Sequence, residues 1–134
     1  MTDLRKYKRV PPNLNSWWKW DAQVVQYPVI GQPGISYKQE EFTEPELKGL
    51  KVDCILYRNE NGILIGILNH YPQDIPGWEK AGNFNVFVDP TQQRKGIGKD
   101  LIKEALTRFN TTLEQQSWTP SGFLMLQSYL RTNQ

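Results

Sequence analysis

Apolar residues recur at helical spacing between residues 97 and 109, and this stripe constrains the fold more than any other feature of the chain. Recurrence at intervals of three and four residues places side chains on one face of an α-helix. The pattern therefore predicts an amphipathic helix. Its apolar positions are Ile97, Leu101, Ile102, Ala105, Leu106 and Phe109.

The segment before this helix has the pattern of three β-strands. Residues 52–57 and 63–71 are rich in apolar side chains and flank the turn sequence Asn59-Glu60-Asn61-Gly62. This arrangement predicts an antiparallel hairpin. Residues 83–88 form the third expected strand, which Asp89-Pro90 ends.

The N-terminal third carries less regular signals. Ser16 has the position of an N-cap for a helix that would run to Tyr27, with Trp17, Trp20 and Val24 on one face. We expect the tryptophans to plug one end of the core, with a substrate pocket wall as the alternative.

The segments on either side of the strands and the long helix carry loop, turn and cap signals. Proline and glycine residues indicate a loop over residues 28–43, and Thr43-Glu44-Pro45-Glu46 has the spacing of a capping box before a short helical turn that ends near Gly49. Residues 111–116 fit either a helix tail or a short strand. Thr119 then caps a last helix, with Pro120 at its first position.

Composition limits the class of protein. With 134 residues, of which 38% are hydrophobic, we expect one globular domain over residues 1–134, with residues 1–12 as a flexible basic arm. The single cysteine, Cys54, and the single histidine, His70, exclude an intramolecular disulfide and a multi-histidine site, so no metal is expected.

Charge and hydropathy restrict the partners. The net charge of +2 is too balanced to imply nucleic acid. No apolar run approaches the roughly 20 residues that cross a bilayer. The N-terminus also lacks the apolar stretch of a signal peptide. We therefore expect a cytoplasmic protein without a membrane partner.

The chemistry-bearing segment is residues 86–101, which read as strand, loop, two glycines and helix. A helix N-terminus has unpaired N–H groups and a positive dipole end. Gly96 and Gly98 would let an anion approach the main chain, and Arg94, Lys95 and Lys99 add positive charge. The segment therefore suits a phosphate or pyrophosphate.

The order Val88-Asp89-Pro90 followed by Gln93, Gly96 and Gly98 resembles motif A of the GNAT acetyltransferase superfamily. The resemblance covers residues 50–110. It implies an α/β (α+β) fold with a mixed, mainly antiparallel sheet flanked by helices. It also implies an enzyme that transfers acetyl from acetyl-CoA to an amine. Coenzyme A would contact Phe87, Val88, Gln93, Arg94, Lys95, Gly96, Ile97, Gly98 and Lys99.

The resemblance implies a pantetheine arm in a gap beside the strand at residues 83–88, paired with backbone near Phe87 and Val88. The pyrophosphate would lie on the amides of residues 93–98. The N–H of Val88 would polarise the thioester carbonyl.

The chain departs from the family pattern at the groups that move protons. Many relatives use a glutamate as base, and the corresponding position in this chain is Gly82. The remaining polar candidates are His70 and the nearby Glu79, Asn83 and Asn85. The tyrosine that protonates the thiolate falls on Leu126. Tyr129, one turn later, is the remaining candidate for the acid.

Alternatives remain open for function and assembly. The scaffold could be a non-catalytic coenzyme A-binding or protein-interaction module, and a nucleic-acid-binding protein is the third possibility. The acceptor would lie against residues 14–50, where the tryptophans and Glu40, Glu41, Glu44 and Glu46 would favour a cation. Relatives continue beyond the last helix, so a homodimer that completes the sheet is also open.

Overall fold

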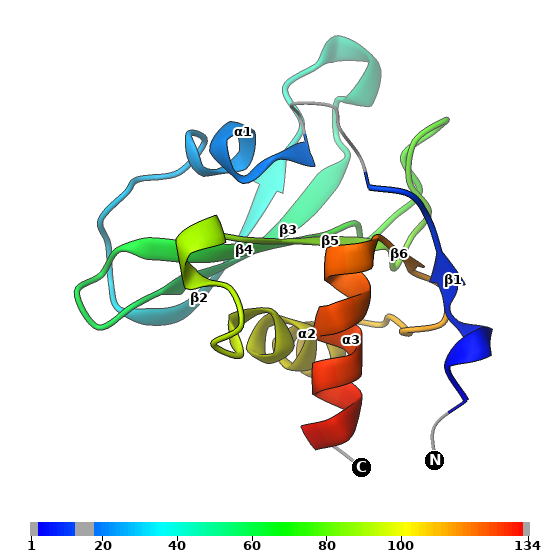
Figure 1. Ribbon diagram of the computed structural model, residues 1–134. Helices are drawn as coiled ribbons and strands as arrows, with labels where there is room; N and C mark the ends of the chain where they lie inside the picture. The colour runs from blue at the N-terminus through cyan, green and yellow to red at the C-terminus, as the bar shows by residue number, and fades with distance from the viewer. Residues whose placement is uncertain (1–2, 13–17, 133–134) are drawn as a thin grey trace.

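The computed structural model describes residues 3–12 and 18–132, which fold around a four-stranded sheet (Figure 1). Its order is β2-β3-β4-β5, and all neighbours are antiparallel. The edges of the sheet are therefore β2 and β5. The strands are β2 (Gly34–Glu41), β3 (Lys51–Arg58), β4 (Leu64–His70) and β5 (Phe84–Val88).

The β3–β4 hairpin and the third strand confirm the predicted pattern. Asn59 closes the turn, because its Oδ1 accepts from Asn61 N at 2.9 Å and from Ile63 N at 3.0 Å. Gly62 completes it with a φ of +78°, a conformation that glycine adopts without strain.

The predicted amphipathic helix is α2 (Ile97–Arg108), and the predicted last helix is α3 (Pro120–Thr132). Both pack on one face of the sheet (Figure 1). Gly66 on β4 allows the approach of α2, since a Cβ there would lie 2.8 Å from Ile97 Cγ2. Thr119 caps α3 as predicted, and its Oγ1 accepts from Gly122 N at 3.2 Å.

The opposite face of the sheet is covered by α1 (Trp20–Val24), which is shorter than the predicted helix. Lys19 takes the N-cap position and makes no side-chain cap. The predicted cap Ser16, together with Trp17, lies outside the described residues. Trp20 and Val24 share a face as predicted, and both pack against Ile67 and its buried neighbours.

The expectation of a loop over the whole of residues 28–43 is wrong, because β2 occupies half of that segment. β2 pairs with β3 along its whole length, from Gly34 opposite Arg58 to Glu41 opposite Lys51. It is an edge strand whose side chains are mostly exposed. Polar residues are therefore tolerated, and the apolar alternation that would identify a strand is weak.

Two other short segments differ from prediction. The expected capping box at Thr43 is replaced by a 3₁₀-helix, Pro45–Leu47, with Glu44 at the N-cap and no side-chain cap. Between α2 and β6 (Ser117–Trp118), residues 111–116 form neither helix nor strand.

The N-terminal segment differs from the free arm that its charge suggested. A 3₁₀-helix, Leu4–Lys6, leads to β1 (Lys8–Arg9), which runs parallel to β6. Tyr7 is only 4% exposed, and the Arg9 guanidinium lies 4.0 Å from the ring centroid of Phe123. The described part of this segment is therefore packed on the core.

Within residues 3–12 and 18–132, no helix has both the length and the apolar character needed to span a bilayer.

Candidate active site

The open edge of β5 presents backbone groups that no strand pairs in the described part of the chain. Asp89 N donates to Ile65 O at 3.0 Å, so Asp89 faces β4. In an antiparallel pair, residues that face the partner alternate with residues that face away. Phe87 therefore also faces β4, whereas Val86 and Val88 direct their N–H and C=O groups to the open edge.

Gln116 separates β5 from β6 at one end of this edge. Its side chain is 3% exposed, and its Oε1 accepts from Phe84 N at 2.8 Å. Its Nε2 donates to Gly82 O and to Thr112 O. The Gln116 side chain thus takes the hydrogen bond that a neighbouring strand would make to β5, and β5 and β6 do not pair.

A cavity of about 200 Å³, called the middle cavity here, lies between β5, β6 and the start of α3. This middle cavity corresponds to the gap that the family resemblance implied beside β5. Phe87 contributes its side chain to it rather than its backbone. Among the lining residues are Asn85, Val86, Phe87, Trp118, Gly122 and Met125.

The second cavity, of about 410 Å³, lies at the N-terminus of α2 and is called the loop cavity here. Gly96 has a φ of +81° and Arg94 a φ of +67°, so the chain turns sharply before the helix begins. Arg94, Lys99 and Arg131 supply positive charge to the lining, and Gln93 reaches Val88 O at 3.5 Å through its Nε2.

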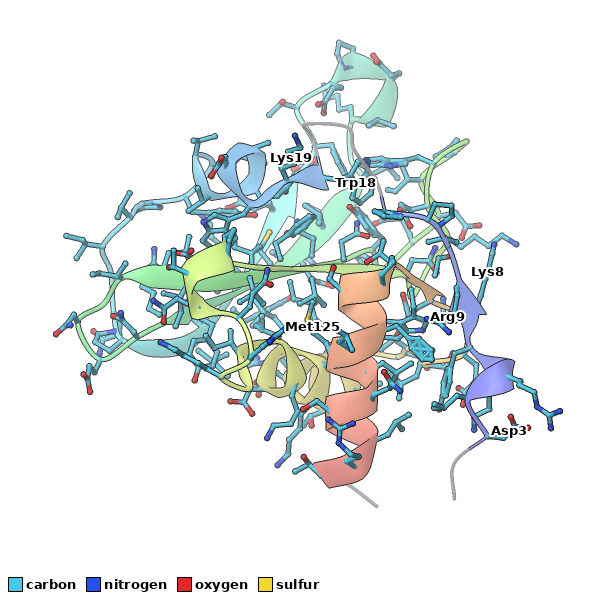
Figure 2. All side chains as sticks on the ribbon, viewed as in Figure 1. Asp3, Lys8, Arg9, Trp18, Lys19 and Met125 are labelled. Carbon is cyan, nitrogen blue, oxygen red and sulfur yellow. The ribbon has the colours of Figure 1, made fainter. Side chains whose placement is uncertain are left out.

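Two residues of the predicted loop site have other surroundings than expected. Lys95 donates through Nζ to Gln92 Oε1 at 3.1 Å and does not line the loop cavity. Gly98 is buried, and a Cβ there would collide with the side chain of Met125 on α3, labelled in Figure 2. Glycine at this position therefore allows α2 and α3 to approach each other.

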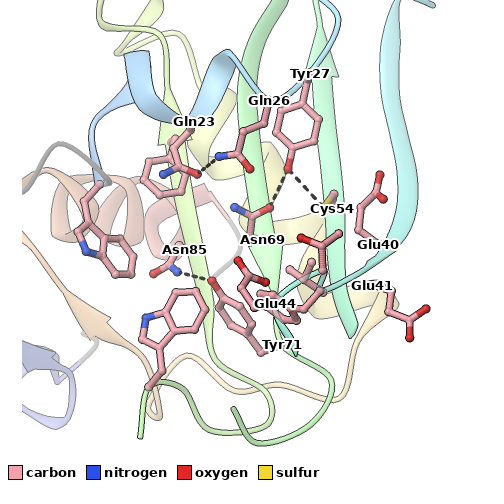
Figure 3. A pocket seen from close by; sticks show the side chains of 16 residues that line it. Gln23, Gln26, Tyr27, Glu40, Glu41, Glu44, Cys54, Asn69, Tyr71 and Asn85 are labelled. Carbon is pink, nitrogen blue, oxygen red and sulfur yellow. Dashed lines mark hydrogen bonds between the residues drawn. The ribbon is translucent and has the colours of Figure 1, made fainter. Parts of the chain in front are cut away.

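The third cavity, of about 550 Å³, lies on the α1 face of the sheet and is called the acceptor cavity here. Its floor follows the register of the strands, because Asn85, Asn69 and Cys54 are consecutive partners across β5, β4 and β3. The Tyr27 hydroxyl lies 3.3 Å from Asn69 Oδ1 and 3.4 Å from Cys54 Sγ (Figure 3).

Aromatic side chains and carboxylates complete the acceptor cavity. Trp78 packs between Tyr71 and Phe42, with ring centroids 5.5 Å and 6.1 Å away. Glu40, Glu41 and Glu44 line the side formed by β2 and the turn after it. Glu40 is paired with Lys38 at 3.0 Å and Glu41 with Lys51 at 3.5 Å. In the described part of the chain, Glu44 has no ion pair.

The three cavities adjoin one another, and together they are called the channel here. The acceptor cavity and the middle cavity share Trp18, Asn85 and Phe87, and the middle cavity and the loop cavity share Ser121 and Met125. A long ligand in the loop and middle cavities would therefore present its end to the acceptor cavity beside Asn85.

His70 does not meet this channel. It is 4% exposed on the α2 face, where its ring stacks on Phe109 with centroids 4.1 Å apart and its Nδ1 lies 2.8 Å from Asp53 Oδ2. Asp53 also accepts from the Tyr37 hydroxyl at 2.6 Å. The structure thus places His70 in a buried polar network that joins β2, β3 and β4.

The other proton-transfer candidates are divided. Asn85 lies where the acceptor and middle cavities meet, as a reacting group requires. Tyr129 packs against the core between the sheet and the helices and is not among the residues that line the three cavities. Leu126 is fully buried, and Met125 faces the channel instead.

The positions near Gly82 have structural roles. Gly82 has a φ of +93°, a conformation that disfavours a glutamate there. Glu79 accepts from Asn83 Nδ2 at 2.9 Å, and burial raises the pKa of Glu79. Neither residue lines the acceptor cavity.

Sequence reasoning missed Tyr27, Asn69 and Tyr71, which form much of the cavity floor. A signal existed for two of them, because Asn69 and Tyr71 follow Ile67 at intervals of two and so share its face of the sheet. Within residues 3–12 and 18–132, no three His, Cys, Asp or Glu side chains gather as a metal site would require.

Comparison with known protein families identifies the family of this chain. The family model described as acetyltransferase (GNAT) family matches residues 15–115, which include α1, the four-stranded sheet and α2. No curated protein and no solved structure matches the chain significantly. The predicted mixed α/β fold and the predicted family are both confirmed: the chain belongs to the GNAT family, whose members are generally acetyltransferases.

Proposed function

We propose that this protein is an acyl-CoA-dependent N-acyltransferase that transfers acetyl from acetyl-CoA to the amine of a cationic acceptor. One observation carries the proposal. The gap beside the open edge of β5 meets the acceptor cavity at Asn85 and Phe87. A donor and an acceptor that enter from opposite directions would therefore meet at one point.

The donor side fits a coenzyme A thioester. The outward N–H of Val88 and the outward C=O of Val86 would pair with the pantetheine arm. The amides at the N-terminus of α2, with Arg94, Lys99 and Arg131, would hold the pyrophosphate. Bound there, acetyl-CoA supplies an activated acetyl group.

The carbonyl of the thioester needs a hydrogen-bond donor as negative charge develops on its oxygen. Sequence analysis assigned this role to the N–H of Val88. Val88 lines the loop cavity, whereas Val86 lines the middle cavity that adjoins the acceptor. We therefore assign the role to the N–H of Val86.

The acceptor side fits an amine with positive charge. Glu40, Glu41 and Glu44 favour a cation, and the aromatic walls can hold its apolar stem. Asn85 donates through Nδ2 to the Tyr71 hydroxyl at 3.2 Å, so its Oδ1 can accept a hydrogen bond from the attacking nitrogen. An amide takes no proton at neutral pH, so the proton that the ammonium form must lose before attack would leave through water and the carboxylates.

Direct attack on the thioester is favoured over an acyl-cysteine intermediate. Cys54 is the single cysteine of the chain and is 2% exposed. Burial raises the pKa of its thiol, which leaves little thiolate for nucleophilic attack.

A second candidate is a non-catalytic coenzyme A-binding or protein-interaction module. The observation in its favour is that His70 and Tyr129, two candidates for proton transfer, are not among the residues that line the channel. This candidate predicts binding of acetyl-CoA without turnover.

Release of coenzyme A thiol from acetyl-CoA tests the proposal, with mass detection of the acetylated product. The acceptors are benzylamine, n-butylamine, 1,4-diaminobutane and a lysine-containing peptide, with benzyl alcohol as the control. We expect amine-dependent release that is fastest with the dication. Saturable binding of acetyl-CoA with no release above the alcohol control would favour the second candidate.

A further inference from the structure

Tyr71 follows the last residue of β4 and lies in the acceptor cavity beside Asn85 (Figure 3). Its side chain is 4% exposed. Asn85 Nδ2 donates to the Tyr71 hydroxyl oxygen at 3.2 Å. Asn85 itself lines both the acceptor cavity and the middle cavity. The hydroxyl is therefore fixed next to the point where the donor and acceptor cavities meet.

The hydroxyl proton of Tyr71 remains available. The hydroxyl oxygen accepts from Asn85, and within the described residues the proton itself has no acceptor. Trp78 packs against the Tyr71 ring with centroids 5.5 Å apart, which restricts the ring. Tyr71 is thus a restrained phenol whose proton is not used in a hydrogen bond to any of the described residues.

Burial raises the pKa of Tyr71, and the nearby Glu79 carboxylate adds to the shift. The phenol is therefore protonated throughout the pH range in which amines are acylated. It therefore keeps its proton until the chemical step and is unsuited to serve as the initial base.

We propose that Tyr71 is the general acid that protonates the departing coenzyme A sulfur, a role that rests on the proposed function. The acceptor nitrogen forms a bond to the carbonyl carbon. The carbon–sulfur bond then breaks, and its electron pair stays on sulfur. The Tyr71 proton moves to that sulfur. The phenolate regains a proton from the acylated nitrogen, which carries one proton in excess, so no further reactant is required.

Other tyrosines of the site are less suited. Tyr27 also lines the acceptor cavity, but its hydroxyl is engaged with Asn69 and Cys54, away from the middle cavity. Tyr129 is the candidate that sequence reasoning named on α3. It packs against the core and is not among the lining residues. In many relatives the acid is a tyrosine at the position of Leu126 on α3, and leucine has no proton to donate. Tyr71 would supply that proton from the end of β4.

The test compares wild type with Tyr71→Phe, Tyr27→Phe and Tyr129→Phe. Each variant is assayed with acetyl-CoA and with its selenoester analogue, using the fastest amine of the panel above. A selenol is a much stronger acid than a thiol, so its anion leaves without protonation. Thermal unfolding and the KM for acetyl-CoA report whether each variant folds and binds the donor.

We expect Tyr71→Phe to lose about a hundred-fold in kcat with acetyl-CoA, within the range for a positioned general acid. Its loss with the selenoester should stay below roughly ten-fold, and its KM for acetyl-CoA should not change. The two control variants should lose less than roughly ten-fold with either donor.

Equal losses with both donors, or an undiminished kcat, would overturn the role of Tyr71 while leaving the proposed function intact. A selective loss with acetyl-CoA in Tyr129→Phe would move the acid to α3. Absence of turnover by the wild type would overturn the proposed function itself.

Discussion

The two halves of the proposed site, one for the donor and one for the acceptor, are built in different ways. The donor half relies on backbone groups from one continuous segment, the open edge of β5 and the turn into α2, with α3 as a wall. The acceptor half relies on side chains from α1, from all four strands of the sheet and from the segments next to them. A donor common to many enzymes can thus be held by main chain, while the acceptor cavity can vary side chain by side chain.

The largest expected effect breaks the donor half alone. Gly96→Glu places a carboxylate beside the expected pyrophosphate and a side chain on a residue with a φ of +81°. Affinity for acetyl-CoA should fall by more than about a hundred-fold, measured by calorimetry. The matched control is Gly77→Glu, because Gly77 has a φ of +74° and open space around it. Equal losses in both variants would refute the anion site.

The difference between the halves also explains how far the sequence could be interpreted. The strand pattern, the glycines and the apolar stripe of the helix each specify the local conformation of the backbone. The segment from β5 through α2 was therefore predictable from the local sequence. The acceptor cavity depends on register, which brings Asn85, Asn69 and Cys54 into one row although they are far apart in the chain. No local pattern specifies that row.

The edge strand β2 shows the same limit. Its residues are mostly exposed, and it forms a strand because it pairs with β3 rather than because of its own composition. His70 shows the converse. The sequence suggested a lone histidine at a strand end as a candidate base. Because side chains alternate between the two faces of a strand, His70 instead lies on the α2 face with Asp53.

The second prediction concerns stability rather than turnover. His70→Gln removes the contact of Nδ1 with Asp53 Oδ2 and leaves a buried carboxylate with one partner fewer. The free energy of unfolding should fall by about 1–3 kcal/mol in denaturant titration. His70→Asn can restore a donor near the Nδ1 position, so it should lose less. A loss of kcat above roughly ten-fold, with folding intact, would return His70 to the site as a base.

A smaller effect sharpens the acceptor half. Glu44→Gln removes the cavity carboxylate that has no ion pair among the described residues. An exposed ion pair contributes up to about 1 kcal/mol, so the KM for 1,4-diaminobutane should rise by at most about five-fold at low salt. Affinity for acetyl-CoA should stay the same. Glu46→Gln is the control, since Glu46 does not line the cavity, and an equal rise there would indicate only long-range charge.

The smallest effect concerns Glu79, which lies outside both halves. Burial raises its pKa in the folded protein, so its contribution to stability is present below its unfolded pKa and lost as pH rises through the folded value. Glu79→Gln should therefore increase stability slightly near neutral pH and leave it unchanged near pH 4. Thermal unfolding at the two pH values measures this. A variant that is less stable at neutral pH would show that the carboxylate is needed there.

A crystal structure of the protein with acetyl-CoA would show whether the donor reaches the acceptor cavity at Asn85. We expect the pyrophosphate at the N-terminus of α2 and the pantetheine arm along the open edge of β5. The thioester carbonyl oxygen should lie about 3 Å from the N–H of Val86, with the acetyl group beside Asn85. Acetyl-CoA bound outside the β5–β6 gap, or a thioester that does not reach the acceptor cavity, would contradict this expectation.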